Sequence, residues 1–195
     1  VSELTGSLCL GTIESICATI FPELLREYHR LYPKVNVRLI TDSPETLLEM
    51  MNSNAIDIVY FLDKRMYDSK WIKVLEEPED IVFVTASGHP FVGRDSLDLD
   101  LVIDQPFILT ERNASYRFIL DQYLEIGNTE FIISLLRKNL GVSFLPEFTI
   151  HQDIINGELA VLDVRDFYMR TWRQIVYHKD KWVTREMDAF LRLAT

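Results

Sequence analysis

A short polar stretch follows the first apolar segment and contains side chains that could bind a small ligand. The stretch lies where the alternating residues 7–11 (SLCLG) lead into a long helical pattern, and it contains Gly11, Thr12, Glu14 and Ser15. The start of a helix leaves backbone N–H groups unpaired and carries partial positive charge, so it attracts a carboxylate or another anion. Glycine lets a ligand approach the backbone, and the hydroxyl groups could donate hydrogen bonds. The stretch predicts either an anion-binding turn or a helix cap formed by Thr12.

Glu14 limits which anion could bind there. A carboxylate beside the site opposes an anionic ligand unless it points outward or pairs with an amino group of that ligand. If Glu14 faces the ligand, a zwitterion such as an amino acid becomes the favoured class.

Motifs of catalysis and metal binding are absent from the sequence. The GxSxG, P-loop and GxGxxG patterns do not occur, and the four histidines lie far apart with no metal-ligand spacing. We therefore expect no enzyme activity, no metal and no cofactor. Cys9 and Cys17 could form a redox pair, but they also fit small buried apolar residues in a reducing cytosol.

Composition indicates a soluble globular chain. The 195 residues are 48% hydrophobic and 26% charged, which suits a folded core better than disorder. The apolar runs are too short to span a membrane, and residues 1–6 (VSELTG) do not resemble a signal peptide. The net charge of −10 argues against direct binding of a nucleic-acid backbone. We expect a cytoplasmic protein that contacts neither membrane nor DNA through these residues.

The order of apolar patterns predicts an α/β fold with a parallel sheet. Strands are expected at residues 7–11, 35–41 and 56–62. Helices are expected at residues 14–31, where Pro22 marks a first turn or a kink, and after Ser43–Pro44. Strands that alternate with helices require crossover connections, which are typical of parallel sheets.

The rest of the chain repeats this theme with weaker signals. Two strands without an intervening helix are expected at residues 71–75 and 80–86, and later strands at 106–110, 142–146, 159–164 and 171–179. Helices are expected at residues 115–124, 127–141 and the C-terminus. Asn128 or Thr129 would cap the second of these helices, and Gly141 would give it a left-handed end. At Tyr123–Leu124 a helix meets a strand with no turn residue, so we expect a loop to be missing there.

Five segments in a fixed order carry a family resemblance. They are SLCLGTIES (7–15), FPELLREYHRLYPKVNVRL (21–39), SPETLLEMMNSNAIDIVYF (43–61), GHP (88–90) and LLRKNLGVSFLP (135–146). Together they resemble the effector-binding domain of LysR-type transcriptional regulators, over roughly residues 3–192. No single motif is diagnostic, but the ordered series at family spacing is specific.

The resemblance implies a two-lobed α/β fold like that of type 2 periplasmic solute-binding proteins, with two crossing strands between the lobes and a ligand cleft. One lobe would be residues 1–75 plus 164–195, and the other 76–163. Family members are homodimers or tetramers in which a winged helix-turn-helix domain precedes this one. That domain is absent here, so the chain is expected to be an excised sensor that reaches DNA only through it. Tyr28 and Phe131 would contribute to the oligomer surface.

The resemblance also selects candidate ligand contacts. It places residues 11–15 at the cleft and Ser43 in a second ligand-contacting turn, where Pro44 stands in place of the hydroxyl residue that the family often has. Thr110 and Arg112 of the second lobe could close over a ligand, although a solvated loop with Arg112 paired to an acid is the plainer alternative. The remaining candidates are Asn128 and Thr129.

These expectations combine into one functional prediction. The chain would sense a small, carboxylate-bearing metabolite between its lobes and so control DNA binding and transcription by the full-length oligomer. A solute-binding protein of a transport system, which has the same fold, is the alternative.

Overall fold

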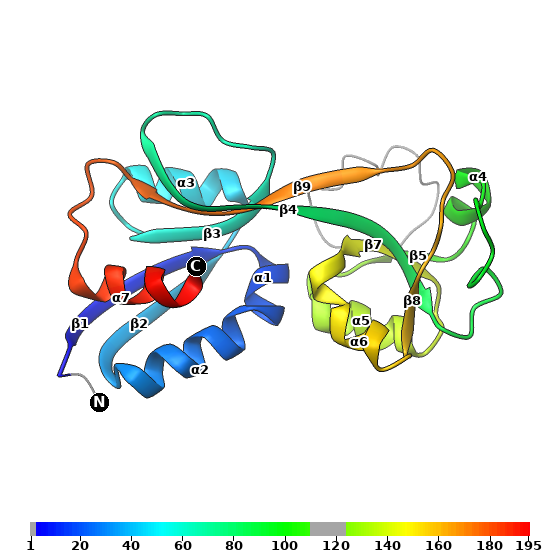
Figure 1. The fold of residues 1–195 in the computed structure, drawn as a ribbon, viewed down its shortest axis with the longest axis horizontal. Helices are drawn as coiled ribbons and strands as arrows, with labels where there is room; N and C mark the ends of the chain where they lie inside the picture. Colours follow the sequence, from blue (N-terminus) through cyan, green and yellow to red (C-terminus); the bar gives the residue numbers. More distant parts are fainter. Residues whose placement is uncertain (1–2, 110–123) are drawn as a thin grey trace. The chain divides into compact units, whose positions relative to one another are not determined.

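The computed structural model describes residues 3–109 and 124–195. The chain divides into two α/β units, unit 1 of Val1–Pro78 with Thr171–Thr195 and unit 2 of Glu79–Arg170. Strands β4 (Trp71–Ala86) and β9 (Met169–His178) contain the two boundaries and run from one unit into the other (Figure 1). The predicted α/β fold whose two parts share two strands is confirmed.

Unit 1 is built on a mixed sheet with the strand order β2-β1-β3-β9-β4. Its first three strands are β1 (Thr5–Thr12), β2 (Lys34–Thr41) and β3 (Ile58–Asp63). β1 lies between β2 and β3 and is parallel to both, whereas β9 is antiparallel to β3. The helices of unit 1 are α1 (Glu14–Thr19), α2 (Phe21–Leu31), α3 (Pro44–Asn52) and α7 (Arg185–Ala194). The break between α1 and α2 falls beside Pro22, as predicted.

Helices cover both faces of this sheet, α3 on one face and α2 and α7 on the other (Figure 1). We call these the α3 face and the α2 face. Val59, Phe61 and Val176 pack with α3 in one apolar cluster. On the α2 face, the rings of Phe21 and Tyr60 have centroids 6.0 Å apart. Successive strand residues point to opposite faces, so a single apolar run supplies both cores.

Tyr28 of α2 belongs to the core and not to the surface where an oligomer contact was expected. Its side chain is 1% exposed, and its hydroxyl donates a hydrogen bond to the Glu186 carbonyl oxygen at 3.0 Å. Burial, with the charge of Glu186, raises the pKa of Tyr28 to about 12. The expectation was wrong because helical spacing alone does not say which side of α2 faces α7. Phe131, the other expected residue, is 53% exposed.

Unit 2 has the strand order β4-β7-β5-β6, with β8 also paired to β4. The strands are β5 (Phe107–Leu109), β6 (Leu124–Glu125), β7 (Val142–Pro146) and β8 (Leu159–Val161). The helices are α4 (Leu99–Ile103), α5 (Thr129–Arg137), α6 (His151–Ile155) and the 3-10 turn η2 (Glu147–Thr149). Separate apolar clusters fill its two faces, one around Phe83 and Phe144 and one around Val84 and Leu145. Among the described residues, no helix has both the length and the apolar character needed to cross a membrane.

Two local predictions fail in this part of the chain. Residues 71–86 form one continuous strand where two were expected, because Pro78 and its acidic neighbours lie within the strand and not in a turn. Asn139, with φ of 58°, takes the left-handed conformation after α5 that was assigned to Gly141. Gly141 is needed for space instead, since a Cβ there would lie 2.0 Å from the Pro106 carbonyl oxygen.

Candidate functional site

The carboxyl edge of the parallel strands in unit 1 is the place where the topology favours a ligand. From β1 the chain crosses to β2 on one side and then to β3 on the other, with α2 and α3 on opposite faces (Figure 1). In α/β sheets, ligands bind beyond the carboxyl ends of strands at such a reversal of strand order. Three strands end at this edge: β1 at Thr12, β2 at Thr41 and β3 at Asp63.

Gly11 has a packing role at this edge. It is buried in β1, and a Cβ there would lie 2.9 Å from Ile56 Cδ1 and 3.0 Å from Leu47 Cδ2. Glycine therefore lets α3 and its following loop pack closely against β1. This accounts for the residue without any ligand.

Thr12 is the last residue of β1 and does not cap the following helix. Its side chain has no exposed area, and its hydroxyl donates to the Tyr60 carbonyl oxygen at 2.7 Å. The residue at the N-cap of α1 is Ile13, which makes no side-chain capping bond. The predicted cap is therefore wrong, because the strand extends one residue further than its alternating pattern. The Thr12 proton is already engaged in joining β1 to β3.

Glu14 and Ser15 form the first turn of α1, and both are half-buried. The Ser15 carbonyl oxygen accepts a hydrogen bond from the Thr19 hydroxyl at 2.7 Å. Burial and the Glu14 charge raise the pKa of the Cys17 thiol, and burial and Asp57 raise that of Cys9. Both cysteines are unpaired, and the raised pKa values disfavour the reactive thiolate.

Ser43 caps α3, as its position before Pro44 predicts. Its side-chain oxygen accepts from Thr46 N at 3.3 Å, and its own N–H donates to Asp42 Oδ1 at 2.7 Å. The Asp42 N–H in turn donates to the Thr12 carbonyl oxygen at 3.2 Å, which places the β2–α3 turn beside the end of β1. The two predicted turns of unit 1 therefore lie together at one edge of the sheet.

The predicted residues of unit 2 divide into three groups. Asn128 caps α5, since its Oδ1 accepts from Phe131 N at 2.8 Å. Thr129, in the first turn of that helix, has no exposed area. Thr110, Arg112 and the join at Tyr123 lie outside the described residues.

Arg173 is a charged residue at the unit 1 edge that the sequence analysis missed. It lies on β9 beside β3, where its Nη1 donates to the Tyr60 hydroxyl at 2.9 Å. Its Nη2 forms an ion pair with Glu77 of β4. The side chain is 22% exposed. In the sequence it is one polar residue of the stretch TWRQIVYHK, and only strand pairing reveals its neighbours.

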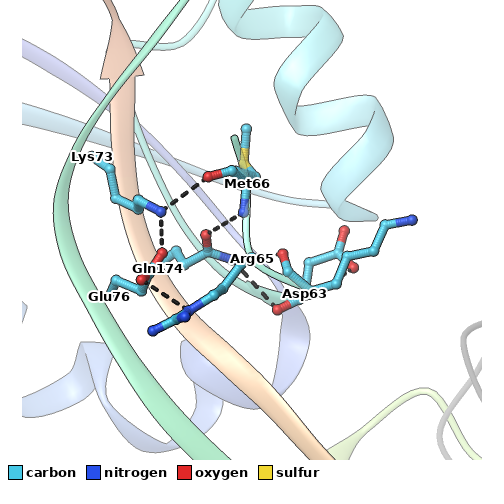
Figure 2. A network of polar contacts seen from close by, with 7 residues as sticks. Asp63, Arg65, Met66, Lys73, Glu76 and Gln174 are labelled. Carbon is cyan, nitrogen blue, oxygen red and sulfur yellow. Dashed lines mark hydrogen bonds and ion pairs between the residues drawn. The ribbon is translucent and has the colours of Figure 1, made fainter. Parts of the chain in front are cut away.

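On the opposite face of β9, Gln174 holds the loop that follows β3 (Figure 2). This glutamine has no exposed area. Its Nε2 donates to the carbonyl oxygens of Asp63 at 3.4 Å and Lys64 at 3.1 Å, and its Oε1 accepts from Met66 N at 3.1 Å. One buried amide thus satisfies three backbone groups of the loop.

Charged side chains extend this network toward solvent (Figure 2). Lys73 donates to the Met66 carbonyl oxygen at 3.0 Å and pairs with Glu76. Glu76 also pairs with Arg65 at 3.1 Å, and the Arg65 guanidinium lies 3.8 Å from the ring centroid of Trp172. Opposite charges and aromatic stacking satisfy each of these groups, so the network is a structural clamp on the loop.

Clusters of metal ligands and surface hollows are two further features that can mark a site among the residues that the structure describes. In the described ranges, no three His, Cys, Asp or Glu side chains gather closely enough to hold a metal ion. A hollow of about 350 Å³ in unit 2 is lined by Glu79, Glu147, Phe148 and His151. It contains none of the predicted ligand contacts.

Comparison with known proteins agrees with the fold. The family model for the LysR substrate binding domain matches residues 2–195. An uncharacterized HTH-type transcriptional regulator, YwqM of Bacillus subtilis (strain 168), is 30% identical over 99% of this chain and 69% of its own length. This chain spans about two thirds of the length of such relatives.

Two solved structures show the same architecture. The CcmR regulatory domain of Synechocystis PCC6803 in complex with 2-PG has a TM-score of 0.73 at 22% identity, covering 96% of this chain and 95% of that one. The effector binding domain of QuiR in complex with shikimate has a TM-score of 0.68 at 15% identity, covering 98% and 96%.

Proposed function

Because the chain belongs to the LysR substrate binding domain family, we propose that it is the effector-sensing part of a LysR-type transcriptional regulator. The observation that carries the proposal is the family match over residues 2–195. Relatives that match nearly the whole chain are HTH-type transcriptional regulators, which supports a regulator over a solute-binding protein of a transport system. These relatives are longer than this chain, so DNA contact would be made by a part that lies outside it.

The proposed effector is a small metabolite with a carboxylate, bound at the carboxyl edge of the strands in unit 1. The β1–α1 and β2–α3 turns lie together there, joined by the bond from the Asp42 N–H to the Thr12 carbonyl oxygen; Ser15 is half-buried in the first turn, and Ser43 belongs to the second. A cation, Arg173, lies at the same edge of the sheet. The structural neighbour QuiR binds shikimate, which is a carboxylic acid, and this supports the class of ligand. Gly11, Thr12 and Glu14 stay candidates for shaping this site, and Asn128 and Thr129 stay candidate ligand contacts within unit 2.

Regulation requires two arrangements of the protein with different affinities for the effector. A ligand that binds both equally shifts nothing, however tightly it binds. We propose that the bound arrangement is passed through a homo-oligomer to the DNA-binding parts and changes their contacts with the promoter.

Thermal unfolding of this chain tests the proposal. The panel contains shikimate, dicarboxylates, aromatic acids, amino acids, sulfate and phosphate, with uncharged sugars as a control class. A ligand at 100 times its Kd stabilises by about 2.7 kcal/mol, which raises Tm by several degrees in a domain of this size. A shift confined to one carboxylate class, and reduced in Ser15→Ala but not in the distant Ser53→Ala, supports the site. No shift with any carboxylate contradicts it.

A further inference from the structure

Strand pairing places Arg173 two strands to the side of β1, past the level at which β1 ends. Thr12 is opposite Tyr60 in the sheet, Tyr60 is opposite Ile175, and Leu62 is opposite Arg173. Arg173 therefore precedes Ile175, the residue level with Thr12, by two positions on the antiparallel β9, which places it beyond the carboxyl end of β1 in the direction of that strand. It lies on the α2 face, because its guanidinium reaches the Tyr60 hydroxyl, and the Tyr60 ring packs against Phe21 of α2.

Two side chains that contact Arg173, Tyr60 and Glu77, differ in how firmly they are fixed. Tyr60 is 2% exposed and cannot move without disturbing the core. Glu77 is a surface side chain on β4 that is 50% exposed, and it can rotate into water. The guanidinium is thus anchored by a neutral phenol and paired with a replaceable carboxylate.

From this geometry we propose that Arg173 recognises the carboxylate of the effector by exchanging it for Glu77. The inference rests on the proposed function and adds to it the residue that reads the ligand charge and the side chain that competes for it. Arginine is suited to this exchange, since its planar guanidinium offers parallel N–H groups to either carboxylate.

Charge balance explains why Glu77 must leave. The Arg173–Glu77 pair is neutral, so a second carboxylate beside it would meet a like charge at close range. Turning Glu77 into solvent removes that repulsion, and the exchange of one carboxylate for another leaves the charge around the guanidinium unchanged. The Tyr60 hydroxyl can stay bonded to Nη1 throughout, which keeps the arginine in position.

The other arginine near this edge is unsuited to such an exchange. Arg65 lies over Trp172 and pairs with Glu76, which also pairs with Lys73. A ligand that displaced Glu76 from Arg65 would leave it held by Lys73, so no carboxylate would be released. Displacing Glu77 from Arg173, by contrast, turns that carboxylate into solvent.

The experiment follows the Arg173 Nε–H signal by NMR in the intact chain during titration with acetate at constant ionic strength. Shikimate and the neutral methyl acetate are titrated in parallel. Removing the competitor in Glu77→Gln is expected to lower the half-saturating acetate concentration about two- to fivefold, as for an exposed ion pair. Glu23→Gln makes the same change of net charge at an exposed ion pair of α2 and is expected to match the wild type. Arg173→Met lacks this signal and is followed by the backbone amide signals of β9 instead; it is expected to lose at least roughly tenfold in affinity.

Glu77→Gln is expected to raise the affinity for acetate, and Arg173→Met is expected to lower it. These opposite signs separate recognition of the carboxylate from a merely structural role of the pair. If Arg173→Met does not fold, Glu77→Gln decides the question, because its substitution is on the surface. An Arg173 signal that acetate does not move, or equal affinities in Glu77→Gln and Glu23→Gln, overturns the inference. If the thermal panel finds an effector that Glu77→Gln does not affect, the inference fails while the proposed function stands. If acetate binds with the expected Glu77 dependence and no effector is found, the exchange stands and the proposed function fails.

Discussion

Two adjacent residues of strand β9, Arg173 and Gln174, point to opposite faces of the same sheet and are held in different ways. Gln174 has no exposed area and bonds only to backbone groups of the loop after β3. Arg173 keeps 22% of its side chain exposed, and its contacts include the Tyr60 hydroxyl and the half-exposed carboxylate of Glu77. Backbone partners cannot leave unless the loop unfolds, whereas a surface carboxylate can rotate away.

This difference separates polar groups held by the backbone from polar groups that can exchange a surface partner. A buried polar side chain whose partners are all backbone groups stabilises one conformation, because any alternative leaves those groups unsatisfied. A partly exposed cation with a side-chain partner can exchange that partner at little cost. On this basis the α3 face of unit 1 is fixed, and the carboxyl edge of its α2 face is where chemistry can change.

Replacing Gln174 should have the largest effect on stability. Gln174→Leu leaves the Met66 N–H and two carbonyl oxygens without their partner, and it should lower the free energy of unfolding by about 3 kcal/mol. The expected decrease in Tm is roughly 6–12 °C. Gln152→Leu, at an exposed glutamine of α6, is the matched control and should change little. A Tm of Gln174→Leu equal to that of the wild type would show that the α3 face is not fixed.

Gly11→Ala tests the packing of the same α3 face. Its new Cβ would meet Ile56 and Leu47 at 2.9 and 3.0 Å, and overpacking of this kind costs about 2 kcal/mol. Gly88→Ala is the control, since a Cβ there has no atom within 4 Å. Urea unfolding of the two variants measures the difference. Equal stabilities would contradict the explanation given for Gly11.

Arg173→Met should lower stability less than either change on the α3 face. The loss of the bond to Tyr60 and of a partly exposed ion pair is worth about 1 kcal/mol. The methionine stem still covers the apolar surface that the arginine stem covers. Chemical denaturation would measure the change. If Arg173→Met lowered the free energy of unfolding more than Gln174→Leu does, the α2 face and not the α3 face would be the fixed one.

Glu77→Gln should have the smallest effect on stability, within about 0.5 kcal/mol of the wild type, because exposed ion pairs contribute little. Its thermal unfolding should also depend less on salt, since one screened ion pair is removed. The control is Glu23→Gln, which removes the Arg26 ion pair at another exposed site. A loss of several kcal/mol in Glu77→Gln would show that this carboxylate is structural and not replaceable.

Local patterns predicted the elements and caps of this chain well. Pro22 marked the break between α1 and α2, and Ser43 and Asn128 were correct as caps. Such features depend on residues within about four positions, which a sequence shows directly. The same local reading failed at Gly141 and Thr12, where a residue type that suits a helix end is used for close packing and for bonding between strands.

The candidate site could be predicted only in part. The polar turn at residues 11–15 and Ser43 follow apolar strands, so their shared edge could be inferred from an α/β order. Arg173 could not be placed, because 113 positions separate it from Tyr60 and its alternating strand offers no sign of its neighbour. The role of Gln174 was hidden for the same reason, since a polar residue in a strand usually indicates a solvent-facing position.

The sequence by itself determined the α/β order, most of the strands and helices, the family, and the polar turns that follow β1 and β2. Periodicity and capping are local, and they survive any arrangement of the elements in space. Only the tertiary structure decided that Gly11 makes room for α3, that Thr12 is buried, and that β9 lies beside β3. These facts depend on which distant strands pair and on which side of each strand faces a helix. Two neighbouring polar residues of one strand could therefore become a buried amide that holds a loop and a charged group at the proposed ligand edge.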